Sequence, residues 1–319
     1  GDAAETYGLD RRHLVVRDRS DEEVLGALGL FHLESWLFGS QLLSPAFAER
    51  GGPTLGNRRE DAVRRLLLDS VKRMADELDV DFVSLRGSTV AGTDDFEANT
   101  RYVTFRSPTD RSPDGVWDDI KDSRKRQIEQ AADDSSLEYR VGTSLSDLRE
   151  YYRLYLESMR GHGSPPHSFA FFETLWEDLH DAGNLHLGLV THDDSLVNGT
   201  IDLSCGSTVY QWGVVTDYEY RDLNGGSWLL WKSLERAAEA DYDTYEYGRT
   251  REGSGVYMFK KSFGGSKTWY DDLHYFPDGT TDLPDPEDDT YEVAKKVWRR
   301  LPISVTRVVG PRVRKRIGL

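Results

Sequence analysis

Residues Tyr218–Gly265 read YEYRDLNGGSWLLWKSLERAAEADYDTYEYGRTREGSGVYMFKKSFGG. The pattern predicts, in order, a strand, a glycine-containing turn, an amphipathic helix, a second strand and a short helix that ends in glycines. Apolar residues recur in the first helix at the 3.6-residue spacing: Trp228, Leu229, Trp231, Leu234, Ala237 and Ala238. A glycine turn that opens a helix presents unsatisfied backbone N–H groups and the positive end of the helix dipole. We therefore expect an anion to bind at Gly225 and Gly226.

This turn resembles motif A of the GNAT acyltransferase superfamily. In that motif an arginine or glutamine, followed by spaced glycines at a helix start, holds the pyrophosphate of acyl-CoA. Arg221 and Gly226 match the ends of the pattern, and Asn224 stands where its first glycine is expected. The resemblance implies that Arg221, Gly225 and Gly226 bind the donor, whereas Asn224 argues against ordinary CoA binding.

The continuation of the segment resembles the FemAB-type branch of that superfamily, whose members are also described as BioF2-like. Four pieces carry this resemblance: Tyr247-Gly248-Arg249-Thr250, Ser254-Gly255, Phe259-Lys260 and Phe263-Gly264. The resemblance implies tandem GNAT-like domains and no tightly bound cofactor. It also implies that the donor is an aminoacyl-tRNA or an acyl-CoA.

The chain contains a second, degenerate copy of the same strand–helix unit. Three pairs of landmarks share an offset of about 173 residues, namely His13/His186, Gly26/Gly199 and Gly52/Gly225. A helix follows each copy, at 61–78 and 227–240, and leads into a strand that ends in glycine. The repeat favours gene duplication over a chance alignment of two α/β segments.

We therefore predict an α+β fold of two tandem GNAT-like modules, with mixed central sheets flanked by helices. The expected parts are an N-terminal module at 1–110, a C-terminal module at 111–280, and an acidic spacer with a basic tail at 281–319. The chain begins close to a strand without the opening elements of a module, so we expect residue 1 to follow a missing native segment.

The composition is strongly acidic, with 56 Asp and Glu against 40 Lys and Arg and a net charge of −16. Such a surface suits a salt-rich cytoplasm, so a halophilic source, such as a haloarchaeon, is the expectation and an ordinary acidic cytosolic enzyme the alternative. The negative charge argues against broad nucleic-acid binding and against DNA as a partner. The sequence has neither a signal-peptide layout nor an apolar run of about 20 residues, which predicts a cytoplasmic location, with membrane association only through the tail.

The tail at 291–319 reverses the sign of the charge and interleaves basic with apolar residues. Such a segment can lie on an anionic membrane surface, dock on the acidic body of its own protein, or stay disordered. Pro302 and Pro311 exclude one long helix.

Four residues in and after the glycine turn are candidates for the site. Arg249 follows a strand end and can clamp a phosphate or carboxylate, or else pair with Asp222. The FemAB-type resemblance places Lys260 at the substrate groove and makes it a catalytic candidate. Ser254 forms an anion-binding turn or an ordinary loop, and Asn224 positions substrate or only shapes the turn.

A second cluster, at 159–167, ends a helix in a rigid loop with two histidines. His162 or His167 is a candidate general base, because histidine titrates near neutrality; the alternative is an ordinary surface histidine. Their spacing does not suit a metal pair, and we expect no metal. Tyr210 and Trp212, in the strand before the glycine turn, either line the substrate groove or pack in the core.

Arg124, Lys125 and Arg126 form a basic patch on a predicted helix. They either contact the phosphates of a tRNA donor or form a solvated helix face balanced by nearby acids.

Acyl transfer to an amine fits these features, because it needs no covalent nucleophile and none is evident. The leading prediction is a Fem-like transferase that moves an activated acyl or aminoacyl group to an amine, either a small molecule or a lipid-linked cell-envelope precursor. The alternatives are an acyl-CoA-dependent N-acetyltransferase and a catalytically inactive ligand-binding module of the same fold.

Overall fold

The computed structural model describes residues 6–35, 39–88, 94–279 and 289–317. The described chain forms two compact units, which we treat separately. Unit 1 is built mainly from Val103–Thr268 and Asp289–Pro311. Unit 2 is built mainly from Tyr7–Tyr102 and from residues that begin again at Trp269. Each unit is therefore discontinuous in sequence.

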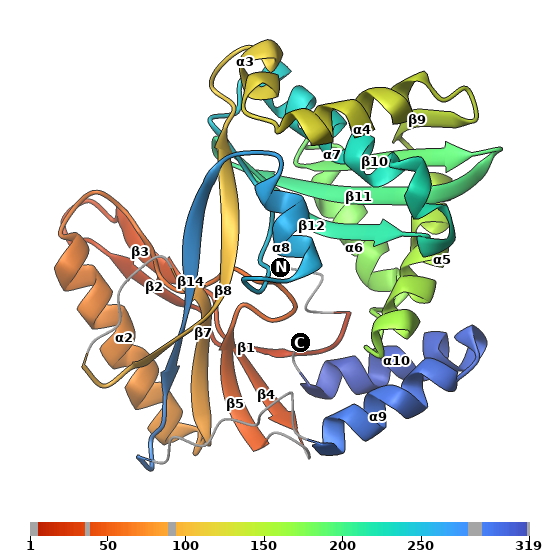
Figure 1. Ribbon diagram of the computed structural model, residues 1–319. Coiled ribbons are helices and arrows are strands. Elements are labelled where there is room, and N and C mark those ends of the chain that lie inside the picture. The colour runs from red at the N-terminus through yellow and green to blue at the C-terminus, as the bar shows by residue number, and fades with distance from the viewer. Residues whose placement is uncertain (1–5, 36–38, 89–93, 280–288, 318–319) are drawn as a thin grey trace. The chain divides into compact units, whose positions relative to one another are not determined.

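Unit 1 contains the segment that the sequence singled out, on six consecutive strands of the main sheet (Figure 1). The strand order is β8-β13-β12-β11-β10-β9, antiparallel except for the parallel pair β12–β13. Its strands are β8 (Glu97–Pro108), β9 (Leu137–Gly142), β10 (Leu185–His192), β11 (Ser195–Cys205), β12 (Thr208–Thr216) and β13 (Thr244–Glu246). Its helices are α3 (Pro113–Asp118), α4 (Asp122–Asp133), α5 (Leu145–His162), α6 (Phe169–Leu179), η1 (Tyr218–Leu223), α7 (Gly225–Glu239), α8 (Gly255–Lys261), α9 (Asp289–Arg300) and the first part of α10 (Ile303–Ile317).

Helices cover both faces of this sheet. Successive side chains of a strand point to opposite faces, so two neighbouring residues on β11 show which helix lies on which face. On β11, a Cβ at Gly199 would lie 2.8 Å from the ring of Tyr151 on α5. The neighbouring residue Asn198 points the other way, toward the start of α7. The glycine at 199 thus allows α5 to approach the sheet closely, and the two helices that matter for the site lie on opposite faces.

Unit 2 contains the strand order β1-β4-β5-β7-β14 and a separate small sheet of order β2-β3-β6. Its strands are β1 (Asp10–Arg11), β2 (Leu14–Arg17), β3 (Val24–Leu28), β4 (Phe31–Ser35), β5 (Gly39–Ser44), β6 (Thr54–Leu55), β7 (Phe82–Ser88) and β14 (Ser266–Tyr275). One helix, α2 (Glu60–Glu77), buries an apolar stripe of Val63, Leu67, Leu68, Val71 and Ala75 against these strands. Both β8 and β14 contain residues of each unit.

The predicted α+β fold with mixed sheets and flanking helices is confirmed. The strand–helix–strand unit occurs twice: α2 connects the parallel strands β5 and β7, and α7 connects the parallel strands β12 and β13. The matched landmarks Gly26 and Gly199 are not equivalent. Gly199 lies on β11, which pairs with β12 of the repeated unit, whereas Gly26 lies on β3, which pairs with β2 and β6 in a separate sheet and not with β5. A constant sequence offset did not distinguish a neighbouring hairpin from the true counterpart.

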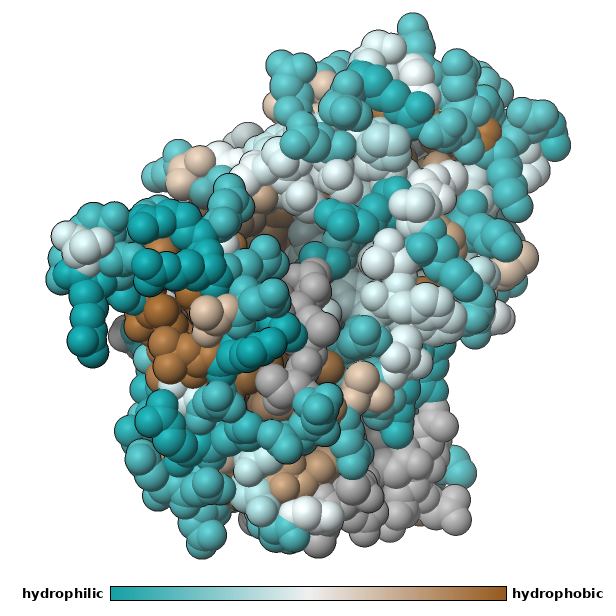
Figure 2. Space-filling view, turned by 90° about the vertical axis from the view of Figure 1, so that its left-hand side faces the viewer, coloured by the Kyte–Doolittle hydropathy of each residue, from teal (hydrophilic) through white to brown (hydrophobic). Residues whose placement is uncertain are grey.

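The surface that Figure 2 displays is largely hydrophilic, as 30% charged residues lead one to expect, with apolar side chains gathered in small areas. Within the described ranges, no helix is both long enough and apolar enough to cross a bilayer. The tail, over its described residues 291–317, lies in two helices separated at Leu301 and Pro302. The prediction that one long helix is excluded holds at Pro302, whereas Pro311 lies inside α10.

Candidate functional site

The start of α7 is shaped by a close contact with β11. Asn224 adopts a left-handed backbone conformation (φ 59°, ψ 15°) and ends η1 as α7 begins. A Cβ at Gly225 would lie 2.5 Å from Oδ1 of Asn198, and one at Gly226 would lie 3.3 Å from Nδ2. Glycine at 225 is thus required so that the helix can begin directly over the Asn198 amide.

The first turn of α7 has unsatisfied donors. It contains no acidic residue, and the Asn224 side chain makes no capping hydrogen bond. Among the described residues, the N–H groups of Gly225 and Gly226 find no acceptor, whereas the N–H of Ser227 donates to the Asn224 carbonyl at 2.9 Å. The turn therefore presents N–H donors and the positive end of the helix, and anion binding at Gly225 and Gly226 stays a prediction.

Arg124 of α4 adds a full positive charge to this turn. Its Nη1 donates to Oγ of Ser227 at 2.8 Å and to Oε1 of Gln127 at 2.6 Å, and its Nε donates to Oγ of Ser262 at 2.8 Å. Its guanidinium also stacks over the Phe259 ring, 4.5 Å from the centroid.

All of these hydrogen-bond partners are neutral, and within the described part of the chain no carboxylate pairs with Arg124. Burial lowers the pKa of the Arg124 guanidinium, which nevertheless stays protonated in proteins. A half-buried cation without an acidic counterion, beside a helix N-terminus, favours an anionic ligand. The sequence grouped Arg124 with Lys125 and Arg126 and gave no signal for this contact, which depends on how α4 packs on α7.

The parallel strands β12 and β13 separate beside this turn. They pair only from Thr208↔Thr244 to Tyr210↔Glu246, whereas β12 continues to Thr216 and stays paired with β11 throughout. Among the described strands, none pairs with the β13-side edge of β12 beyond Tyr210. A splayed strand edge of this kind leaves backbone groups available to an extended ligand.

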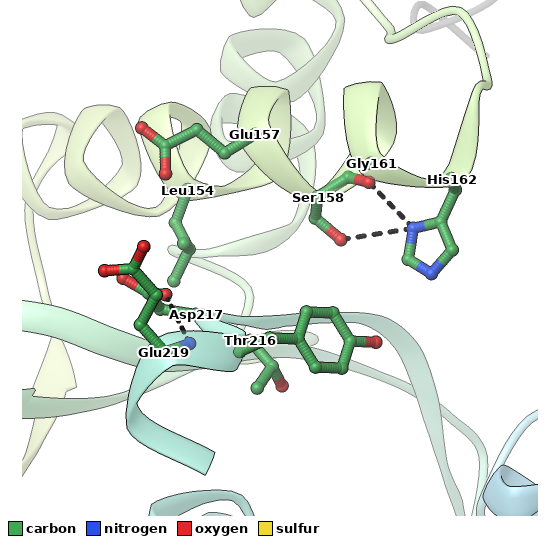
Figure 3. A pocket seen from close by; sticks show the side chains of 9 residues that line it. Leu154, Glu157, Ser158, Gly161, His162, Thr216, Asp217 and Glu219 are labelled. Atoms are coloured by element: carbon green, nitrogen blue, oxygen red, sulfur yellow. Dashed lines mark hydrogen bonds between the residues drawn. The ribbon is translucent and has the colours of Figure 1, made fainter. Parts of the chain in front are cut away.

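A cavity of about 340 Å³ lies at the far end of β12, between α5 and η1 (Figure 3). Side chains from α5 line one side and side chains from the end of β12 and from η1 line the other. The lining residues are Leu154, Glu157, Ser158, Gly161, His162, Thr216, Asp217, Tyr218 and Glu219. Asn198 connects this cavity to the glycine turn, because its Nδ2 donates to Oγ1 of Thr216 at 3.1 Å.

The cavity is acidic and contains one histidine. Glu157, Asp217 and Glu219 bring three carboxylates to its walls, and Oδ1 of Asp217 accepts a hydrogen bond from the Glu219 N–H at 3.0 Å. Nδ1 of His162 lies 2.8 Å from the Ser158 carbonyl oxygen (Figure 3). A carbonyl can only accept, so this contact requires the proton on Nδ1 and leaves Nε2 as the acceptor in neutral imidazole.

The other histidine of the predicted pair does not line the cavity. His167 is only 2% exposed, and its ring stacks on Phe171 with centroids 4.1 Å apart. Trp212 joins the same aromatic group, 6.1 Å from Phe171 and 5.8 Å from Phe172. These contacts give both side chains packing roles, and the half-buried Tyr210 lies at the point where β12 leaves β13.

The candidate residues that follow β13 hold the loop after this strand and the start of α8 in place. Nζ of the buried Lys260 donates to the carbonyl oxygens of Gly248 at 3.0 Å and Arg249 at 3.3 Å. Oγ of Ser254 accepts the Tyr257 N–H at 3.1 Å as the N-cap of α8. The half-buried Arg249 lies in the loop that Lys260 holds. None of these residues lines the described cavity, so the structure groups them apart from His162.

Arg221 lies in η1, between the cavity and the glycine turn in sequence. Its side chain is 73% exposed, and its Nε lies 3.5 Å from Oδ1 of Asp222. Sequence reasoning placed this arginine at the donor, whereas the structure gives it an acidic neighbour and makes Arg124 the cation that contacts α7. In the described ranges, no three His, Cys, Asp or Glu side chains gather in a way that could hold a metal ion.

Comparison with known protein families identifies the central part of unit 1. Residues 121–261 match the Acetyltransferase (GNAT) domain. The match spans α4 to α8 and thus includes Arg124, the glycine turn, the splayed strand and the cavity. No curated protein sequence matches the chain.

Solved structures share the fold over most of the chain. A structure of FemX is similar with a TM-score of 0.67 and 15% identity, covering 86% of this chain and 90% of that one. A C-terminal domain assigned to a lysylphosphatidylglycerol synthetase of Agrobacterium fabrum gives 0.57 and 10%, covering 85% and 84%. A tandem GNAT protein from the clavulanic acid biosynthesis pathway gives 0.54 and 14%, covering 86% and 85%. The fold is therefore that of tandem GNAT-like proteins.

Proposed function

We propose that this chain is an acyltransferase that moves an activated acyl or aminoacyl group to an amine acceptor. One observation carries the proposal: within the GNAT domain, Asn198 joins a phosphate-type anion seat at α7 to an acidic, histidine-containing cavity at the end of β12. The first element suits an anionic donor and the second a cationic acceptor. A reaction between the two would take place along the splayed edge of β12.

The donor would bind through its phosphates. The N–H groups of Gly225 and Gly226 and the guanidinium of Arg124 would hold phosphate oxygens, so that the chain extends along β12 toward the cavity. Acyl-CoA and aminoacyl-tRNA both carry such phosphates and a reactive carbonyl. The similarity to the GNAT domain family supports the first donor, and the similarity to FemX supports a Fem-like aminoacyl transfer from the second.

The acceptor would enter the cavity as an ammonium ion attracted by Glu157, Asp217 and Glu219. Nε2 of His162 would take a proton from the amine, whose nitrogen then attacks the carbonyl carbon of the donor. The C–N bond forms, and the bond to the leaving group breaks as the tetrahedral oxyanion collapses. The second proton of the attacking nitrogen passes to the leaving sulfur of CoA or to the leaving ribose oxygen of the tRNA, which gives the amide and the free thiol or hydroxyl. Backbone N–H groups on the splayed edge of β12 would stabilise that oxyanion. Lys260 and Arg249 would keep the loop after β13 in place.

A lipid-linked acceptor has specific support, because one similar structure is assigned to a lysylphosphatidylglycerol synthetase. Small-molecule amines remain the other class that the cavity could accept. A ligand-binding module without catalysis is the third reading, and it predicts binding without turnover.

The test is thermal unfolding of the protein with acetyl-CoA, CoA, aminoacyl-tRNA and uncharged tRNA, followed by turnover with a panel of amines. We expect one activated donor to raise the midpoint of unfolding and to be consumed only when an amine is present. Loss of transfer after RNase treatment identifies the tRNA-dependent reaction. Stabilisation without turnover on any amine supports the binding module, and no stabilisation by any donor refutes the donor seat.

A further inference from the structure

The helical tail docks on unit 1 through one face of each helix. On α9, Nε of Arg299 donates to the Gly161 carbonyl oxygen of α5 at 3.2 Å. On α10, Thr306 is completely buried, and a Cβ at Gly310 would lie 2.4 Å from Cδ of Pro166. The small residues at 306 and 310 are one helical turn apart, so they allow α10 to approach the loop before α6 closely. Of the possibilities left open by the sequence, docking on the body is thus realised (Figure 1).

The opposite face of α9 is apolar and basic. Val293 and Val297 are 61% and 56% exposed, and Lys296 and Arg300 are exposed as well. These four positions are spaced i, i+3, i+4 and i+7, so they share one side of the helix. Exposed valines one turn apart are unusual on a solvated helix of an acidic protein, because they gain nothing from contact with water.

The outward side of α10 is apolar as well. Val305, Val308 and Val309 are 39%, 53% and 40% exposed, and their spacing of i, i+3 and i+4 places them on one side of the helix. Residues 293–317 contain nine Lys and Arg and no Asp or Glu, in a chain whose net charge is −16. Among the residues that the structure describes, no carboxylate pairs with Lys296 or Arg300. These two cations are therefore available to an external anionic partner.

We propose that this outward face, which we call the tail face (Val293, Lys296, Val297, Arg300, Val305, Val308 and Val309), binds the surface of an anionic lipid bilayer. Valines beside cations fit a bilayer, since the apolar groups enter the interface while the cations contact lipid phosphates. A nucleic acid would use the cations but not the valines, and the described part of this face has no exposed aromatic side chain on which a base could stack. The acidic remainder of the chain would be repelled by the same bilayer, which would orient the protein with the tail face toward it.

The tail face is linked to the cavity through α5. Gly161 accepts the hydrogen bond from Arg299 and also lines the cavity next to His162. Binding at the tail face would therefore hold the cavity near the bilayer surface, where a lipid-linked amine is available. This last step rests on the proposed function, whereas the lipid contact itself does not.

The experiment is flotation of the protein with phosphatidylcholine vesicles, with and without phosphatidylglycerol, at low and high salt. We expect binding only to vesicles that contain phosphatidylglycerol, and weaker binding at high salt. The double variant Lys296→Glu/Arg300→Glu should bind at least about tenfold more weakly. Val293→Ser/Val297→Ser should also weaken binding, since it removes apolar contact and no charge.

A matched control changes the net charge equally at exposed positions of unit 2, with Arg19→Glu/Arg65→Glu, and should bind as the wild type does. Circular dichroism confirms that each variant is folded. The proposal is overturned if the wild type does not float with anionic vesicles or if the control loses binding as strongly as Lys296→Glu/Arg300→Glu. It is also overturned if the tail-face variants lose only tRNA binding in a gel-shift assay. None of these outcomes depends on whether transfer activity is found.

Discussion

The proton on Nδ1 of His162 is fixed by the Ser158 carbonyl, which gives the imidazole a defined acceptor nitrogen. We expect His162→Gln to lower kcat about 10²- to 10⁴-fold, because the amine then loses its general base. The KM for the donor should change little, since the donor seat lies at α7. Steady-state kinetics with saturating amine measures both constants. His180→Gln, in the same unit but outside the cavity, is the control, and an equal loss of kcat there would argue against a specific role for His162.

A second prediction concerns Arg124, which we propose binds the phosphate of the donor. Replacing it by glutamine removes a charge-assisted hydrogen bond worth about 2 kcal/mol, so the donor should bind roughly 30-fold more weakly. Isothermal titration provides the measurement, with the donor that raises the midpoint of thermal unfolding in the test described above. The control is Arg126→Gln, which removes the same charge from an exposed position two residues away. Equal affinities for the two variants would mean that Arg124 only packs α4 against α7.

At the scale of single elements, the start of α7 makes a steric prediction. Gly225→Ala would place a methyl group 2.5 Å from Oδ1 of Asn198, whereas Gly226→Ala would place one at a more tolerable 3.3 Å from Nδ2. We expect the first change to cost about 1–3 kcal/mol of folding free energy and to weaken donor binding, since the turn must shift. The second should cost clearly less. Chemical denaturation of both variants gives the comparison, and the reverse order would show that the turn is not held by Asn198.

The same scale shows what sequence reasoning can reach. The turn–helix–strand–helix order of 224–261 was predictable because its signals are local: glycines at the turn and a 3.6-residue apolar stripe. The strand expected at the start of the segment was wrong, since Tyr218–Leu223 forms the 3-10 helix η1 and β12 ends before it, at Thr216. The roles of Arg124 and Lys260 were not predictable, since one depends on the packing of α4 on α7 and the other on a buried contact with backbone carbonyls. Asp217 and Glu219 were overlooked because a carboxylate at the end of a strand looks like ordinary surface until α5 faces it.

For the whole molecule, the half-buried His186 and the buried His274 couple stability to pH. Burial, with a smaller contribution from the charge of Arg236, lowers the pKa of His186 to about 3 from an ordinary 6.5. The unfolded chain therefore binds a proton between these values that the folded chain does not. This stabilisation is complete above pH 6.5 and is lost as the pH falls toward 3.

Between about pH 7.5 and about pH 5, His186 should account for a loss of roughly 2 kcal/mol in the free energy of unfolding. His186→Gln should make the pH dependence shallower by that amount, as measured by urea denaturation at several pH values. His274, in the other unit, has its pKa lowered to about 4 by burial, so part of the pH dependence should remain in the variant. An unchanged slope in His186→Gln would contradict the assignment.

Because both units are discontinuous in sequence, neither can fold completely until late in translation. Unit 2 begins to emerge first, yet its part of β14, from Trp269 on, is synthesised only after Val103–Thr268, and unit 1 in turn awaits α9. A nascent chain therefore exposes an incomplete sheet edge for most of its translation, the kind of intermediate that chaperones protect. Translation halted before residue 289 would leave the last turn of α5 uncovered and unit 1 without the helix that packs on it.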